Sequence, residues 1–120
     1  MVDDGEIYAA ERGEVLAGSG RAVTPETPFK LGAISKSFTA MAVMQLVEAG
    51  QVDLDTEIAA YLEMFAGRPA GVMTIRQLLS HTSGLSTLQG NDTHTDRTGD
   101  ADELTRQVAR IAQWTPAHEP

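Results

Sequence analysis

Residues 34–49 carry the most restrictive pattern in the chain, a run of about four helical turns that is followed by Gly50. Apolar side chains nearly encircle the helix that this spacing predicts and leave only a narrow polar stripe. They are Phe38, Met41, Ala42, Val43, Met44, Leu46 and Val47. Glycine readily adopts the left-handed conformation that ends a helix. We therefore expect a helix that ends at Gly50, is buried on most sides and is central to the fold.

The acidic composition narrows the range of partners. The 120 residues include 9 Lys and Arg against 17 Asp and Glu, which gives a formal net charge of -8. This charge repels phosphate backbones and anionic lipid, so nucleic acid and membrane surfaces are excluded as expected partners. Hydrophobic residues make up 42%, enough for one packed domain, and no apolar run has the length of a membrane span. The absence of cysteine excludes a thiol nucleophile and leaves the compartment open.

The first thirty residues predict short strands. Glu6–Ala10 and Glu14–Ala17 flank a turn at Arg12-Gly13, and Asp3-Asp4-Gly5 is typical of a hairpin tip. The first strand of that hairpin is then expected before Met1, so we interpret the chain as starting inside a sheet. Because an unpaired sheet edge is a template for another strand, self-association through this edge is a further hypothesis.

Three short helices are predicted after residue 50, each from a capping residue and an apolar stripe. The caps are Asp55 for a helix through Leu62, Thr74 for a helix that ends at Gly84, and a capping box of Asp100 with Glu103. Residues 114–120 are expected to be the start of a loop without an anchoring element. The C-terminal two thirds of the chain are therefore predicted to be mainly helical.

The acidic segments are not predicted to bind metal. In Asp53–Glu57, capping accounts for every carboxylate, and no ligand such as histidine is nearby in the sequence. From Asp92 to Glu103 the spacing partly fits a twelve-residue calcium loop. However, His94 replaces an oxygen ligand and Arg97 stands where the turn requires glycine. We therefore expect no metal site.

The segment Gly32-Ala33-Ile34-Ser35-Lys36 relates to known chemistry. In an S-x-x-K motif a serine attacks a carbonyl, and a lysine three residues later on the same helical face takes its proton. The segment resembles this motif as it occurs in the serine β-lactamase-related and penicillin-binding-protein-like family, which includes class C β-lactamases, esterases and DD-peptidases. Thr24–Phe29, Leu46–Asp55 and Ile75–Leu85 resemble the same family in order and spacing.

This resemblance implies an α/β fold, namely an α+β sandwich of the β-lactamase/transpeptidase-like type. Residues 1–120 are expected to be a partial domain, with a sheet edge and turn in residues 1–30 and part of the helical subdomain in residues 31–120. The C-terminal sheet segments are expected to be absent. The implied activity is acyl transfer or hydrolysis of a small acyl substrate through an acyl-enzyme, without a cofactor. The substrate would be a β-lactam, a D-amino-acid peptide or a small ester, and Lys36 would be the general base.

Ala33 departs from the family pattern at the position of the nucleophile. Because a methyl group cannot attack a carbonyl, we predict that the chain is inactive. Two later family motifs, Tyr-x-Asn or Ser-x-Asn and Lys-Thr-Gly or His-x-Gly, are also missing from the sequence. An engineered replacement of serine and a natural pseudoenzyme both account for Ala33. A non-catalytic binding or scaffold module of the same fold is the alternative function.

Neighbouring hydroxyl groups are not expected to replace the missing serine. Ser35 and Ser37 each differ from Lys36 by one position, a rotation of about 100° around a helix, so neither faces the amine. His81 and Ser83 lack an orienting carboxylate, and we interpret that segment as a structural turn.

Overall fold

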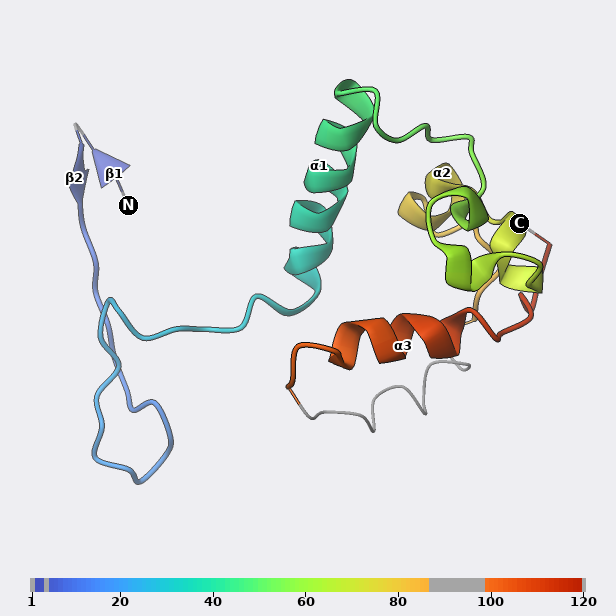
Figure 1. Cartoon of the computed structure of the whole chain (residues 1–120). Helices are drawn as coiled ribbons and strands as arrows, with labels where there is room; N and C mark the ends of the chain where they lie inside the picture. The colour runs from blue at the N-terminus through green and yellow to red at the C-terminus, as the bar shows by residue number, and fades with distance from the viewer. Residues whose placement is uncertain (1, 4, 87–98, 120) are drawn as a thin grey trace. The chain divides into compact units, whose positions relative to one another are not determined.

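The computed structural model describes residues 2–3, 5–86 and 99–119, and the chain divides into two compact units, residues 1–35 and 36–120 (Figure 1). In the first unit, strands β1, Val2–Asp3, and β2, Glu6–Ile7, pair antiparallel with Val2 opposite Ile7. Gly5 between them has φ +83°, a conformation that glycine adopts without a steric penalty. The predicted hairpin is confirmed, but its first strand is β1 and does not precede Met1.

The predicted strand at Glu14–Ala17 is wrong. Glu14 instead forms an isolated antiparallel bridge with Ala22, and the Val15 N–H donates to the Arg21 carbonyl at 2.9 Å. Gly18 and Gly20 lie between the two partners, and glycine is unfavourable in a strand because it has no side chain to pack and loses more conformational entropy on folding.

The α1 helix, Ser35–Glu48, lies within one residue of the predicted ends, and a 3-10 turn, Gly32–Ile34, comes before it in the chain. Gly50 follows with φ +70°, so it ends the helix as predicted. The expectation of burial is wrong, because no residue of α1 is buried and the side chains of Phe38 and Met41 are 60% and 63% exposed. Within the described residues only one face of α1 is partly covered, the face that carries Ala40, Val43 and Val47.

Three 3-10 turns and a short helix follow α1. The turns are η2, Ile58–Ala60, η3, Glu63–Phe65, and η4, Pro69–Val72, and the helix is α2, Ile75–Leu79. Thr74 precedes α2 as predicted and forms a reciprocal capping box with Gln77, with N–H to side-chain oxygen distances of 3.2 and 2.8 Å. The helix ends before the predicted Gly84, and His81 takes the left-handed conformation at φ 60°.

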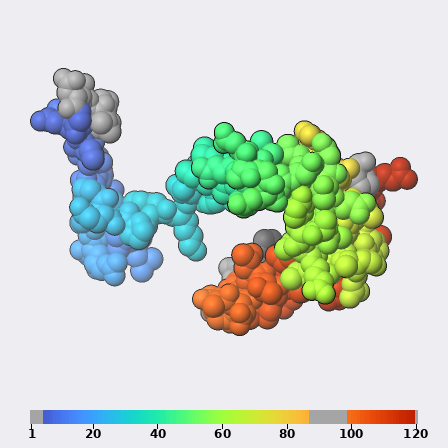
Figure 2. All heavy atoms as spheres, turned by 45° about the horizontal axis from the view of Figure 1, so that its top comes forward, coloured from blue at the N-terminus to red at the C-terminus, as the bar shows by residue number. Residues whose placement is uncertain are grey.

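The core of the second unit lies where α3, Glu103–Ile111, meets the 3-10 turns. Figure 2 shows the orange atoms of α3 against the yellow-green atoms of those turns. Buried here are Phe65, Ala70, Met73 and Ala112, and Val108 and Ile111 of α3 pack against them. The side chains of Phe65 and Met73 are only 2% and 1% exposed, so this cluster contains the largest apolar groups that the fold removes from water.

The start of α3 differs from the predicted capping box. Asp102 occupies the N-cap position without a side-chain hydrogen bond to the helix. The Asp100 carboxylate instead accepts the Asp102 N–H at 3.0 Å and pairs with Arg106 at 3.0 Å. Glu103 accepts the Gly99 N–H at 2.5 Å. Asp100 lies two residues before the N-cap, so its carboxylate bonds to the turn that precedes the helix and does not cap the helix itself.

The last described residues are anchored to Gly84. The N–H groups of Ala117 and His118 donate to the Gly84 carbonyl at 2.8 and 3.2 Å. Gly84 has φ +77°, and a Cβ atom there would lie 2.1 Å from the His118 carbonyl oxygen. The sequence predicted no anchor at this end, because two backbone hydrogen bonds to a glycine leave no side-chain pattern.

Candidate functional site

Lys36 lies in the first turn of α1 and lines a cleft of about 570 Å³ within the second unit. This volume is in the range of small-molecule sites, roughly 300–1,000 Å³. One wall of the cleft comes from α1, and the others come from residues 52–62 and 75–81. The lining residues are Lys36, Ser37, Thr39, Ala40, Val43, Leu46, Val52, Ile58, Tyr61, Leu62, Ile75, Leu78, Leu79 and His81.

The walls of this cleft are mainly aliphatic. Val43 of α1 and Leu78 of α2 line it and are half buried, whereas Lys36 and His81 are exposed. The basic groups therefore lie nearer to solvent than the apolar walls. No carboxylate lines the cleft among the residues that the structure describes, although the chain has 17 acidic residues. Among the described lining residues, Lys36 thus contributes a charge opposite in sign to the net charge of the chain, and the nearby carboxylates of Asp53 and Asp55 do not line the cleft.

Ala33 lies in the 3-10 turn Gly32–Ile34 of the first unit, and its side chain is exposed. Gly32 before it has φ +58°. Ala33 belongs to the first unit, and Lys36 begins the second. The methyl group of Ala33 offers neither a nucleophile nor a hydrogen-bond donor.

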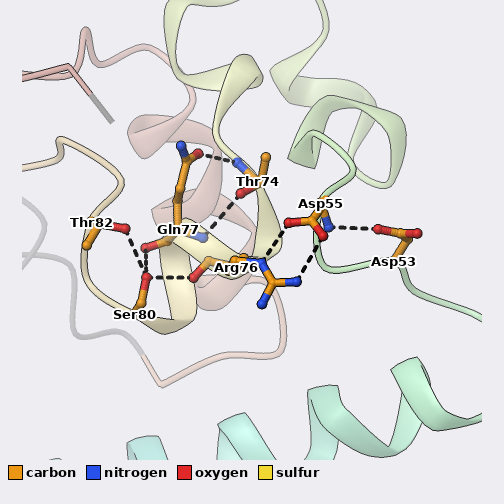
Figure 3. Close-up of polar contacts among 7 residues, drawn as sticks. All are labelled: Asp53, Asp55, Thr74, Arg76, Gln77, Ser80 and Thr82. Carbon is orange, nitrogen blue, oxygen red and sulfur yellow. Dashed lines mark hydrogen bonds and ion pairs between the residues drawn. The ribbon is translucent and has the colours of Figure 1, made fainter.

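A polar network fixes the segments that form the wall opposite α1 (Figure 3). The Asp55 carboxylate accepts two hydrogen bonds from the Arg76 guanidinium, Nε to Oδ1 at 2.7 Å and Nη2 to Oδ2 at 2.9 Å. Asp53 Oδ1 accepts the Asp55 N–H at 2.7 Å, and the Tyr61 hydroxyl oxygen accepts the Asp53 N–H at 2.8 Å. The Arg76 N–H donates to the Leu54 carbonyl at 2.8 Å. The loop after α1 is therefore attached to α2 by side-chain and backbone bonds.

The ion pair changes the acidity of both partners. Hydrogen bonding from Arg76 lowers the pKa of Asp55 below its ordinary value, and the attraction between the two charges acts in the same direction. The same hydrogen bonds raise the pKa of Arg76. Both side chains are more than half exposed, at 57% for Arg76 and 69% for Asp55, so solvent screens their interaction.

This pair shows that the predicted role of Asp55 is wrong. Asp55 does not cap a helix, since η2 begins after Glu57 and has no side-chain cap. Capping preference is a local rule, whereas the partner of Asp55 is 21 residues away in the sequence. The sequence offers a possible signal for this ion pair, namely two carboxylates at 53 and 55 and an arginine at 76. It does not show that these oppositely charged residues come into contact.

Two other candidates from the sequence do not form a catalytic arrangement. His81 is exposed beside the cleft, and Ser83 is 7% exposed. Among the hydrogen bonds between described residues, none joins the two side chains. The Ser80 hydroxyl instead donates to the Arg76 carbonyl at 2.8 Å and lies 2.9 Å from the Thr82 hydroxyl (Figure 3). This segment is thus held as a turn after α2.

The part of the chain that the structure describes contains no group of three or more His, Cys, Asp or Glu side chains placed to hold a metal ion. Most of the segment from Asp92 to Glu103, which partly fitted a calcium loop, lies outside the described residues. No helix in the described ranges is both long enough and apolar enough to cross a membrane.

Comparison with known proteins defines the family. The sequence matches the Beta-lactamase family over residues 1–120, and the chain therefore belongs to the Beta-lactamase family. Membership implies an α/β fold, in agreement with the resemblance found in the sequence. No solved structure gives a significant match.

Three relatives illustrate the membership. Penicillin-binding protein 4 of Amycolatopsis lactamdurans is 44% identical over 86 residues, which are 69% of this chain and 23% of the relative. Esterase EstB of Burkholderia gladioli is 36% identical over 107 residues, which are 83% of this chain and 27% of the relative. The human mitochondrial serine beta-lactamase-like protein LACTB is 35% identical over 89 residues, 70% of this chain and 16% of that protein. The chain thus spans about a quarter of the length of the first two relatives.

Proposed function

We propose that this chain is the nucleophile-bearing segment of a Beta-lactamase-family acyl hydrolase, with Ala33 in the place of the attacking serine. Its helices and its β1–β2 hairpin would be the helical part and a sheet edge of an α+β sandwich. The observation that carries the proposal is Lys36, which lines a cleft of about 570 Å³ from the first turn of α1. The family match over the whole chain supports the same reading.

In this proposal Lys36 is the general base for a serine hydroxyl at position 33, the spacing of the S-x-x-K motif. A serine there would attack the carbonyl carbon of the substrate as its proton passes to the lysine, and the tetrahedral intermediate would expel the leaving group, which takes up that proton, to give the acyl-enzyme. Water would then hydrolyse the acyl-enzyme and regenerate the serine. With Ala33 no oxygen attacks, so no acyl-enzyme forms. The substrate class is a small ester, a β-lactam or a D-amino-acid peptide.

A chimera with the Burkholderia gladioli esterase tests this proposal. The matching segment of the esterase is replaced by the aligned residues of this chain, in the Ala33 form and with Ala33→Ser. We expect hydrolysis of a chromogenic short-chain ester only with Ala33→Ser, and loss of that hydrolysis when Lys36→Met is added. Lys30→Met is the matched control for the charge change. A folded Ala33→Ser chimera without activity, or an active Ala33 chimera, contradicts the proposal.

One observation favours a second function, a binding module without turnover. The cleft keeps its apolar walls and its basic residues while position 33 lacks a nucleophile. A ligand that needs no covalent step would use what the chain retains. This function differs from hydrolysis because it predicts saturable binding by the chain as it stands.

A further inference from the structure

The cleft beside Lys36 combines two properties that together select a ligand. Its walls are aliphatic, and Val43 and Leu78 are half buried on opposite sides of it. The basic groups that line it, Lys36 and His81, are both exposed. A ligand that fills this space needs an apolar body and a negatively charged head that remains near solvent.

The charge distribution makes the choice of head group specific. No carboxylate lines the cleft among the described residues, in a chain whose net charge is -8. The Lys36 amine takes part in no hydrogen bond or ion pair with another described side chain, in contrast to Arg76, which is bound to Asp55. A ligand carboxylate therefore meets an amine that no carboxylate in the described part of the chain neutralises.

We propose that this cleft binds a medium-chain fatty acid. The carboxylate accepts a hydrogen bond from Lys36, with His81 as a second donor, and the hydrocarbon chain lies between Val43 and Leu78. Binding breaks no covalent bond, so it depends on neither the nucleophile nor the acyl chemistry proposed above.

Calorimetric titration of the chain with decanoate, below the concentration at which it forms micelles, tests the proposal. We expect saturable binding of one decanoate per chain. Lys36→Met should weaken this binding by about tenfold, the effect of losing one charge-assisted hydrogen bond. The same variant should leave decanol binding unchanged, because decanol has the same hydrocarbon chain without the charge. Lys30→Met, which replaces the other lysine of the chain, should affect neither ligand.

A second pair of variants tests whether the hydrocarbon chain of the ligand occupies the cleft. Val43→Trp fills the cleft and should abolish binding of both ligands, whereas Met41→Trp lies on a part of α1 that does not line the cleft and should have no effect. Circular dichroism verifies that both variants are folded. The proposal is overturned if decanoate does not bind, if the two lysine variants weaken binding equally, or if Met41→Trp acts like Val43→Trp. The lysine comparison decides the outcome even if Val43→Trp unfolds, and none of these results depends on ester hydrolysis by the chimera.

Discussion

The Arg76 guanidinium donates hydrogen bonds to both carboxylate oxygens of Asp55, from Nε at 2.7 Å and from Nη2 at 2.9 Å. This pair joins α2 to the loop that follows α1. Because this pair lowers the pKa of Asp55, its contribution to stability depends on pH. The pKa is lower in the folded than in the unfolded chain, so the contribution is present above the unfolded pKa. It is lost as the pH falls through the folded pKa.

We predict that Arg76→Gln lowers the urea midpoint at pH 7, and that the difference from the unsubstituted chain shrinks as the pH falls below about 4 and disappears once the pH is below the lowered pKa of Asp55. The NMR titration of Asp55 should move back toward its ordinary pKa in the variant. Arg68→Gln, a change of the same charge at another exposed site, is the control. A difference that stays constant between pH 7 and pH 2 would show that Arg76 acts through packing alone.

Thr74→Ala should destabilise the second unit by about 0.5–2 kcal/mol, because it removes the oxygen that caps α2. Thr74→Ser keeps that oxygen and should retain most of the stability. Urea denaturation followed by circular dichroism measures both. Equal losses in the two variants would mean that the methyl group matters and the cap does not.

Gly84→Ala should destabilise the second unit more than Gly67→Ala does. Both glycines have positive φ, +77° and +68°, so each alanine has a strained backbone that costs about 1–2 kcal/mol. Only at Gly84 would the new Cβ meet another atom, the His118 carbonyl oxygen at 2.1 Å, whereas nothing lies within 4 Å at Gly67. Hydrogen exchange at Ala117 and His118 should accelerate in Gly84→Ala alone. Unchanged exchange there would show that the contact is absent in solution.

Phe65→Ala should cost about 3–5 kcal/mol, the usual effect of a cavity in a packed core. Phe38→Ala makes the same chemical change at a side chain that is 60% exposed and should alter the free energy of unfolding by less than about 0.5 kcal/mol. Denaturant titration of both variants gives the comparison. A large loss in Phe38→Ala would reveal that this face of α1 is covered in solution.

Local patterns predicted some elements of this fold and missed others, such as the strand expected at Glu14–Ala17, and they predicted tertiary relationships less well. The ends of α1 and the N-cap at Thr74 follow from residues that are neighbours in the sequence, and both predictions are confirmed, whereas the capping box that Thr74 forms with Gln77 was not predicted. The burial of α1 was predicted wrongly. Apolar residues on all sides show that a helix could be buried, but they do not show which other segments pack against it. The partner of Asp55 was missed for a related reason, since it lies 21 residues away.

For the candidate site, the motif around Ala33 and Lys36 was visible because the chemistry requires a fixed spacing of three residues. The cleft that Lys36 lines was not predicted, because its walls come from segments separated by up to 45 positions, Lys36 to His81. The aliphatic residues that line it also fit ordinary core positions. Only the folded chain shows that they face a common space.

The contact of Ala112 with Phe65 and Met73 also has a consequence for biosynthesis. A chain emerging from the ribosome exposes its N-terminal end first, at about 5–20 residues per second. The 3-10 turns and α2 form from neighbouring residues and can appear early, but the cluster around Phe65 is complete only after α3 has been translated. Nascent chains that stall before residue 103 would therefore expose the Phe65 side chain to chaperones and proteases, whereas translation through Ala112 supplies the residues that cover it.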